Sequence, residues 1–300
     1  MSVILRDMRV LLTGATGYIG RAVAEAVAAA GHVVVAAARS EAAEIRLRDV
    51  GYETVRGDLR RPESLAEAAV ACDGVLHLAA TQDEDMAASE QATVRAFLAT
   101  LAESGKPFVY TSGVWVYGTA PTGKTLDEDS ATDPVAIYAW RPALEVEVLA
   151  AAGSGVRSVV IRPAMVYGRG GGPLTQFGEM AVDGTPRYVG DGTNHWTLVH
   201  VDDLAWLYLL ALERAPAGTL INAAIGEPIR VRDLAAAATA GAGFAHPPVA
   251  WPQADAATVL GADVAEALTR DHRISGERAR TLLGWEPAVR SPLRELRTRP

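Results

Sequence analysis

The sequence has few cysteines, no concentration of basic residues and no recognisable metal-binding pattern. Cys72 is the single cysteine among 300 residues, which excludes an intramolecular disulfide and a cysteine-rich metal site and favours a reducing compartment. The formal net charge of -8 argues against sequence-independent binding of nucleic acid, which needs a basic surface. No set of His, Asp and Glu residues has the spacing of a metal site, so we expect none.

Segments that would place the chain in or across a membrane are also lacking. The most apolar segment, Leu204 to Leu212, is too short to span a bilayer, so we expect a buried helix there. Residues 1–9 lack the apolar core of a secretory signal. We therefore expect a cytoplasmic protein with no membrane partner. With 49% hydrophobic and 21% charged residues, the chain can form one large domain with a smaller one.

The rest of the chain is organised around a glycine-rich turn near its start. An apolar run at 8–12 is followed by Gly14, Gly17 and Gly20, and then by an Ala-rich, helix-forming run at 21–30. A strand, a tight turn and a helix N-terminus offer backbone N–H groups and the positive end of the helix dipole to a phosphate. The spacing G-x-x-G-x-x-G differs from the commonest dinucleotide pattern, so an ordinary turn is the alternative.

Apolar strands and helix-forming segments alternate downstream of this turn, which predicts right-handed crossovers and a parallel sheet. The polar stretch from Thr119 to Pro134 predicts a surface loop with solvated charges. We expect strands within 32–38, 52–56, 75–78, 108–110 and 156–161, and helices within 62–71, 87–103 and 141–152.

From Gly168 onward, short segments rich in Gly, Pro and aromatic residues predict a second, smaller domain. The expected fold class is α/β, a Rossmann-type doubly wound parallel sheet with a smaller C-terminal substrate domain. Ligands of such sheets bind beyond the carboxyl ends of the strands, here between the two domains. We expect a dinucleotide-binding domain over 1–167, rejoined by 198–224 as a helix (Leu198 to Ala211) and a strand (Thr219 to Asn222), and a substrate-binding domain over 168–197 and 225–300.

The end of the second expected strand bears on the type of dinucleotide. In dinucleotide-binding folds this position meets the adenosine ribose, where an acid binds the 2′-hydroxyl and an arginine suits a 2′-phosphate. Arg39 and Ser40 stand there. They favour NADP(H) as the cofactor, with NAD as an alternative cofactor and a solvated loop arginine as the structural alternative.

Seven short motifs, taken in order, resemble the extended short-chain dehydrogenase/reductase superfamily, which contains nucleotide-sugar epimerases and dehydratases and ketone or aldehyde reductases. The motifs are TGATGYIG (13–20), GDL (57–59), HLAA (77–80), FVYTSGVWVYG (108–118), RPAMVYG (162–168), LVHVDDLA (198–205) and LLGWEP (282–287). The resemblance covers nearly the whole chain. It implies chemistry that depends on NAD(P) and a homodimer formed through the helices at 87–103 and 141–152.

The resemblance also implies which residues bind the cofactor. In the family the glycine loop binds the pyrophosphate, the Asp of the GDL segment holds the adenine edge, and the HLAA backbone and the turn after RP lie by the nicotinamide. Together with Arg39 and Ser40, the expected cofactor-binding residues are Gly14, Thr16, Gly17, Tyr18, Ile19, Gly20, Asp58, Leu59, Leu78, Ala79, Ala80 and Pro163.

The expected catalytic residues depart from the family pattern of a Ser or Thr, a Tyr, and a Lys four residues after the Tyr. A phenol with a pKa of about 10 needs a cation beside it to exchange protons near neutral pH. The fourth residue after Tyr138 is Pro142. Alignment on the K-x-x-x-E tail instead puts Arg141 at the lysine and leaves Ile137 at the tyrosine, so either register loses one member.

The remaining positions of the proton relay also differ. The family's serine position is Gly113, which leaves Ser112 one residue early, and Gln91 replaces a helix asparagine. We expect Tyr138, Ser112 and Arg141 to be the catalytic residues.

Each of the last assignments has a structural alternative. Tyr138 could only pack, and Arg141 could form a surface ion pair with Glu145 at i+4. As a catalytic group Arg141 would stay charged and could not donate a proton.

Trp115 and His195 are the expected substrate contacts, although a structural role is the alternative for His195 and for His200. Ala164 stands where nucleotide-sugar enzymes often carry an Asn, which favours a small carbonyl substrate. The sequence thus predicts an NADP(H)-dependent reductase or dehydrogenase for a small carbonyl or alcohol. The alternatives are an epimerase or dehydratase with tightly held NAD(P), and a non-catalytic NADP-binding sensor.

Overall fold

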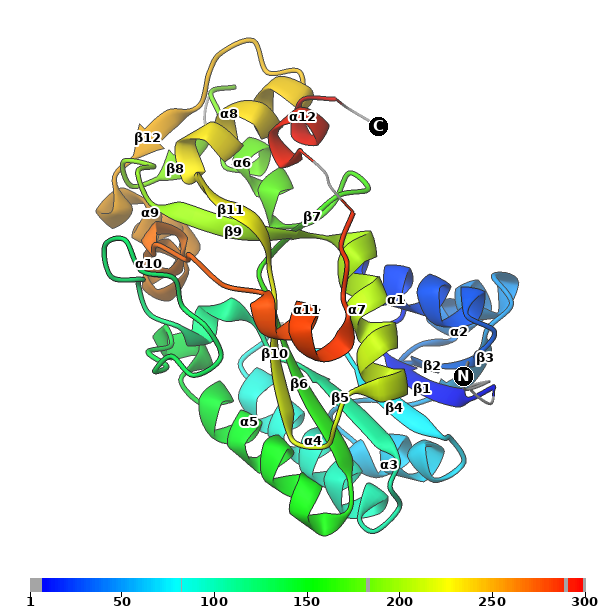
Figure 1. The fold of residues 1–300 in the computed structure, drawn as a ribbon. Coiled ribbons are helices and arrows are strands. Elements are labelled where there is room, and N and C mark those ends of the chain that lie inside the picture. The colour runs from blue at the N-terminus through cyan, green and yellow to red at the C-terminus, as the bar shows by residue number, and fades with distance from the viewer. Residues whose placement is uncertain (1–6, 82, 182–183, 289–290, 299–300) are drawn as a thin grey trace.

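A seven-stranded sheet forms the centre of the computed structural model, which describes residues 7–81, 83–181, 184–288 and 291–298 (Figure 1). Its order is β10-β6-β5-β4-β1-β2-β3, and every neighbouring pair is parallel. This order confirms the expected Rossmann-type α/β fold. The strands are β1 (Arg9–Thr13), β2 (Val33–Ala38), β3 (Glu53–Arg56), β4 (Gly74–His77), β5 (Pro107–Thr111), β6 (Arg157–Pro163) and β10 (Thr219–Ala223).

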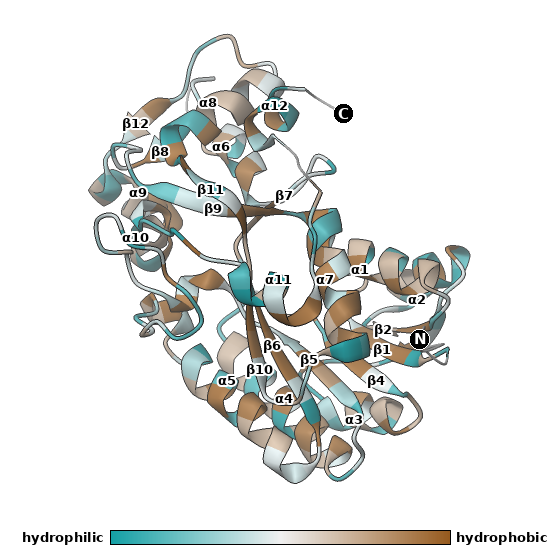
Figure 2. Cartoon of the chain, viewed as in Figure 1, coloured by the Kyte–Doolittle hydropathy of each residue, from teal (hydrophilic) through white to brown (hydrophobic). Residues whose placement is uncertain are grey.

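Helices cover both faces of this sheet, which explains why its central strands are mostly apolar (Figure 2). Two separate apolar cores result, one on each face. One face carries α1 (Tyr18–Ala29), α2 (Glu41–Asp49), α7 (Val201–Arg214) and α11 (Glu277–Leu283), and the other carries α3 (Pro62–Val70), α4 (Met86–Leu101) and α5 (Arg141–Ala150).

Helix α7 contains the most apolar segment of the chain and is buried along Leu204 to Leu212 except at Trp206. Among the described residues no helix is long and apolar enough to cross a membrane. The expectation that this helix starts at Leu198 is wrong, because residues 198–200 belong to strand β9 (His195–His200). The helix begins at Val201, where the His200 side chain accepts a hydrogen bond from the backbone N–H of Asp202 at 3.2 Å.

A smaller unit packs beyond the carboxyl ends of the large sheet, with its own apolar core (Figure 1). Its strands form a three-stranded sheet, β11-β9-β7, and a two-stranded sheet, β12-β8. These elements are β7 (Met165–Tyr167), β8 (Arg187–Val189), β11 (Ile225–Arg230), β12 (Val249–Trp251), α6 (Gln176–Glu179), α8 (Val231–Gly241), α9 (Gln253–Leu260), α10 (Ala262–Thr269) and α12 (Pro292–Arg297).

Helix α11 lies within the range 225–300 that we expected in the substrate domain, yet it packs on the large sheet. Ala279 and Leu283 belong to the same apolar core as α1 and α7. The buried Trp285 indole donates a hydrogen bond to the backbone oxygen of Asp203 at 2.9 Å. The chain therefore returns to the larger unit after α10, and the expected domain boundaries remain a prediction.

Candidate active site

The glycine turn between β1 and α1 packs directly against the carboxyl end of β4. Gly14 has φ +81°, and a Cβ placed on it would lie 2.9 Å from the backbone nitrogen of Ala79. A Cβ on Gly20 would lie 2.0 Å from the backbone oxygen of Gly14. Only glycine fits these two positions. Thr16 and Gly17 are exposed and Ile19 is half-buried, so the turn can hold a phosphate at the start of α1, where no side chain caps the helix.

Thr13 and His77 fix the HLAA segment beside that turn. The Thr13 hydroxyl oxygen accepts hydrogen bonds from the backbone N–H groups of Leu78 at 3.1 Å and Ala79 at 3.2 Å. It also lies 2.8 Å from Nδ1 of His77. Burial, assisted by the nearby Arg141 charge, lowers the pKa of His77 to about 3, so the ring stays neutral. Leu78 and Ala79 are half-buried and Ala80 is exposed, so this segment is partly accessible beside the glycine turn.

The residues expected around an adenosine ribose follow β2 and β3, which are adjacent parallel strands. Arg39 is exposed and makes no hydrogen bond or ion pair with any described residue. The Ser40 hydroxyl caps α2 by accepting from the N–H of Ala43 at 3.2 Å. The Asp58 carboxylate accepts from the backbone N–H of Arg60 at 3.0 Å, and Leu59 is buried.

Tyr18 connects the glycine turn to the smaller unit. Its hydroxyl donates a hydrogen bond to the backbone oxygen of Gly168 at 2.8 Å. A Cβ on Gly171 would lie 2.6 Å from the Tyr18 ring, so the glycine loop after β7 fits closely around that ring. Burial raises the pKa of the Tyr18 hydroxyl well above its usual range, so it stays protonated as a donor.

A hollow of about 260 Å³ lies where β5 and β6 end, at the same edge of the sheet as the glycine turn. Five residues predicted from the sequence line it, namely Ser112, Trp115, Tyr138, Arg141 and Pro163. A larger hollow of about 480 Å³ lies between the loop 167–175 and helices α8 and α12, and none of the predicted catalytic residues lines it. The other residues of the smaller hollow are Gly113, Val114, Val116, Ala164, Met165 and Pro173.

The backbone around Tyr138 explains how this tyrosine and Arg141 meet without the usual four-residue spacing. Tyr138 ends a short 3-10 turn, Ala136–Tyr138, and α5 begins only at Arg141, with Pro142 in its first turn. The guanidinium carbon of Arg141 consequently lies 4.8 Å from the centre of the Tyr138 ring and 4.9 Å from that of Trp140.

Arg141 does not form the surface ion pair with Glu145 that we considered as its structural alternative. Its Nη2 lies 3.3 Å from both carboxylate oxygens of Glu90, on α4. Glu145 instead receives a hydrogen bond from Nε of Arg162 at 3.0 Å. Glu90, and not the neighbouring Gln91, is therefore the α4 side chain that reaches this site, because it faces the core and is only 2% exposed.

Two buried polar atoms around the hollow have no partner among the described residues. They are the hydroxyl oxygen of Ser112 and Nε of Arg141. Buried polar groups are normally paired, so an unpaired hydroxyl and an unpaired N–H beside a hollow can bind an oxygen atom of a ligand. The rings of Tyr138 and Trp115 pack next to them at an angle of 55° to each other, with their centres 5.8 Å apart.

His195, the other expected substrate contact, lies elsewhere. The His195 Nδ1 is 2.6 Å from the Arg273 guanidinium and 3.7 Å from the Asp271 carboxylate. His195 is not among the described residues that line the hollow. Burial and the Arg273 charge lower its pKa. His200 caps α7 and lies 3.0 Å from the Glu295 carboxylate. A substrate role for His195 stays a prediction.

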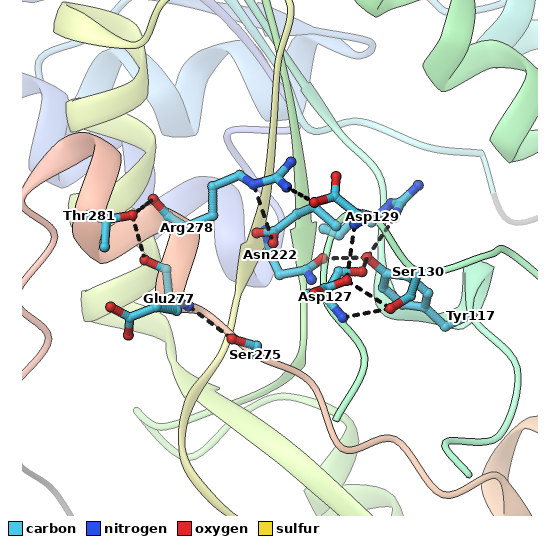
Figure 3. Close-up of polar contacts among 11 residues, drawn as sticks. Tyr117, Asp127, Asp129, Ser130, Asn222, Ser275, Glu277, Arg278 and Thr281 are labelled. Atoms are coloured by element: carbon cyan, nitrogen blue, oxygen red, sulfur yellow. Dashed lines mark hydrogen bonds and ion pairs between the residues drawn. The ribbon is translucent and has the colours of Figure 1, made fainter. Parts of the chain in front are cut away.

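A polar cluster that the sequence did not predict joins the loop 119–134 to β6, β10 and α11 (Figure 3). The Tyr117 hydroxyl accepts from Arg162 at 2.6 Å and lies 3.0 Å from Oδ1 of Asn222, at the end of β10. The backbone N–H of Asn222 donates to the Glu128 carboxylate at 2.7 Å, and Arg278 lies 3.6 Å from the same carboxylate. The expectation that all charges of the loop 119–134 are solvated is wrong, because Glu128 is buried in this cluster.

Comparisons with known proteins agree with this architecture. The model of the NAD dependent epimerase/dehydratase family matches residues 10–224. An uncharacterised protein of Saccharomyces cerevisiae is 33% identical over an alignment of 302 positions, which covers 97% of this chain and 98% of that protein. The 2-alkyl-3-oxoalkanoate reductase of Stenotrophomonas maltophilia is 32% identical over an alignment of 244 positions, which covers 76% of this chain and 73% of that protein.

Solved structures show the same fold. The UDP-glucose 4-epimerase of Thermus thermophilus in complex with NAD has a TM-score of 0.78 at 23% identity, over 97% of this chain and 97% of that chain. The family match covers more than two thirds of the sequence, from β1 to just beyond β10. The chain belongs to the NAD dependent epimerase/dehydratase family, within the extended short-chain dehydrogenase/reductase superfamily.

Proposed function

We propose that the protein is an NADP(H)-dependent oxidoreductase that acts on a small carbonyl or alcohol substrate. The observation that carries this proposal is the hollow lined by Ser112, Tyr138 and Arg141, which shares one sheet edge with the glycine turn. The reductase relative from Stenotrophomonas maltophilia supports an oxidoreductase function.

The residues present fit a dinucleotide. Gly14 and Gly20 leave space that any Cβ would fill, and the uncapped start of α1 offers N–H groups to a pyrophosphate. The partly accessible segment from Leu78 to Ala80 would border the nicotinamide, and Pro163 lines the hollow. When bound, the dinucleotide supplies the hydride acceptor or donor.

The protein's own side chains would supply the proton to the substrate oxygen and stabilise the negative charge that develops on it. In the reducing direction the Tyr138 hydroxyl donates a proton to the substrate oxygen, while the Ser112 hydroxyl donates a hydrogen bond to the same oxygen. The Arg141 guanidinium stays charged and stabilises negative charge that develops there. These roles require no proton transfer by Arg141.

The hollow favours a small substrate. Its volume of about 260 Å³ is below the usual range for drug-sized ligands, and Val114, Met165 and Pro173 give it apolar walls. Ala164 has no polar side-chain group that could bind a diphosphate. These features support a small ketone or aldehyde over a nucleotide sugar.

Arg39 supports NADP(H) as the preferred dinucleotide. It is exposed and unpaired among the described residues, whereas the nearby Arg56 lies 3.5 Å from the Glu44 carboxylate. A free guanidinium after β2 suits a 2′-phosphate.

Stoichiometry of cofactor and product tests the proposed reaction. We expect purified protein to oxidise one NADPH for each molecule of alcohol formed from a small ketone, measured by absorbance and by chromatography. Product without net NADPH consumption would indicate an epimerase or dehydratase. Tight NADPH binding with no turnover of any tested ketone, aldehyde, alcohol or nucleotide sugar would favour the sensor alternative.

A further inference from the structure

Glu90 is a buried acid on α4 with two specific partners. Its side chain is 2% exposed, and its Oε1 accepts a hydrogen bond from the Tyr110 hydroxyl at 2.6 Å. The Arg141 Nη2 lies 3.3 Å from each of its oxygens. A buried carboxylate is costly unless it is paired and hydrogen-bonded. Tyr110 and Arg141 therefore fix the position of the Glu90 carboxylate. The carboxylate in turn fixes the position of the Arg141 guanidinium.

Other contacts of Arg141 would not hold it in that place. Its other cation–π or hydrogen-bonding contacts in the described structure are those with the rings of Tyr138 and Trp140, and its Nε has no hydrogen-bond partner there. Glu145, one helical turn further along α5, is occupied by Arg162. Ring contacts of this type are less directional than a hydrogen bond to a carboxylate. Glu90 thus supplies the directional contact.

We propose that Glu90 is a positioning residue which, anchored by Tyr110, holds the Arg141 guanidinium against the ring of Tyr138 for catalysis. The proposal rests on the proposed oxidoreductase function. A guanidinium stays protonated at every accessible pH, so its effect on the reaction depends on where it lies. The Glu90 carboxylate fixes that place.

A matched pair of variants tests this role. Glu90→Gln keeps the shape of the side chain and removes its charge. Glu147→Gln is the control, because the exposed Glu147 also joins α5 to α4, through hydrogen bonds of 2.8 Å to Arg95, away from the hollow. In crystal structures we expect the Arg141 guanidinium to leave the Tyr138 ring in Glu90→Gln and to stay in Glu147→Gln. A guanidinium that remains within about 5 Å of the ring in Glu90→Gln would overturn the proposal.

A double-mutant cycle with NADPH and ethyl acetoacetate gives the kinetic test. We expect Glu90→Gln to lower kcat at least tenfold, with an unchanged Kd for NADPH, and Glu147→Gln to leave both unchanged. In an Arg141→Met background, Glu90→Gln should change kcat less than twofold. An equal loss in both backgrounds would show that Glu90 does not act through Arg141.

Two further measurements keep the outcomes separate. If Glu90→Gln does not fold, Tyr110→Phe replaces it. We expect this variant to displace Arg141 less and to lose less kcat than Glu90→Gln would. An Arg141 guanidinium that does not move in Tyr110→Phe would contradict the proposal. If the wild type reduces no carbonyl compound with either dinucleotide, the proposed function fails. The crystal comparison then still decides whether Glu90 positions Arg141.

Discussion

At the scale of single residues, the site is defined by which charges have partners and which do not. Arg39 and Arg141 both lie near the carboxyl ends of the large sheet's strands, yet Arg39 is exposed with no partner among the described residues and Arg141 is paired with a buried acid. A free guanidinium can bind an incoming phosphate without breaking an existing contact. A paired one is fixed in place and is suited to act on a group beside it.

Arg39 gives the first prediction. We expect Arg39→Ala to weaken NADPH binding about tenfold or more, since a charge-assisted hydrogen bond contributes about 1.5–3 kcal/mol. NADH binding should change little, because NADH has no 2′-phosphate. Titration calorimetry with both dinucleotides measures this. Equal or tighter binding of NADH by the wild type would contradict the assignment.

His77 gives a prediction about pH. Its pKa of about 3 in the folded protein lies below the usual value of about 6.5, so folding favours the neutral ring. The stability that this provides is complete above pH 6.5 and is lost as the pH falls toward 3. The slope reaches about 1.4 kcal/mol per pH unit for one proton.

Urea unfolding of His77→Asn between pH 7 and pH 4.5 checks this slope. Asparagine retains a polar atom for Thr13 and removes the titration, so we expect the variant to lose less stability on acidification than the wild type. His246→Asn is the control because His246 is exposed. A wild-type slope in His77→Asn would contradict the assignment.

At the scale of elements, the sequence correctly predicted those helices, strands and turns whose structure is determined by neighbouring residues. The glycine turn and the apolar parallel strands were predictable because glycine spacing and continuous burial leave clear signals. Helix α2 was not predicted, since only Ala43 and Leu47 in it are buried. Its signals were Ser40 as a cap, acids in the first turn and arginines in the last.

Contacts between distant elements could not be predicted in this way. Glu90 and Arg141 are separated by 51 residues, and their pairing depends on how α4 and α5 pack side by side. The Tyr117 cluster likewise joins a loop, β6, β10 and α11 (Figure 3). No periodicity in the sequence encodes such pairings. The sequence showed that the positions around Tyr138, Ser112 and Gln91 depart from the family pattern, and the fold was needed to show the geometry of the catalytic residues.

Gly20 allows a test of the first turn of α1. A Cβ there would lie 2.0 Å from the Gly14 oxygen, so Gly20→Ala should destabilise the fold by about 1–3 kcal/mol and abolish tight NADPH binding. Gly153→Ala is the control, since nothing lies within 4 Å of its Cβ position and its φ is not positive. Thermal unfolding and NADPH titration compare the two. Normal NADPH binding by Gly20→Ala would contradict the account of this turn.

At the scale of the whole molecule, helices α4 and α5 form one outer layer of the large sheet (Figure 1). Val146 on α5 is 65% exposed there. The homodimer through these helices remains a proposal. We expect light scattering after size-exclusion chromatography to give twice the chain mass, and Val146→Asp to shift the protein toward the monomer. A wild-type monomer at micromolar concentration would contradict it.

The smaller unit lies beyond the carboxyl ends of β5 and β6, next to the hollow. The central claim is that substrate meets the dinucleotide in this hollow. Tyr138→Phe tests it most directly, because the change removes one hydroxyl and keeps the ring that Arg141 contacts. With NADPH and a ketone that the wild type reduces, we predict a fall in kcat of about 100-fold or more and an unchanged Kd for NADPH. Full activity in Tyr138→Phe would contradict the account.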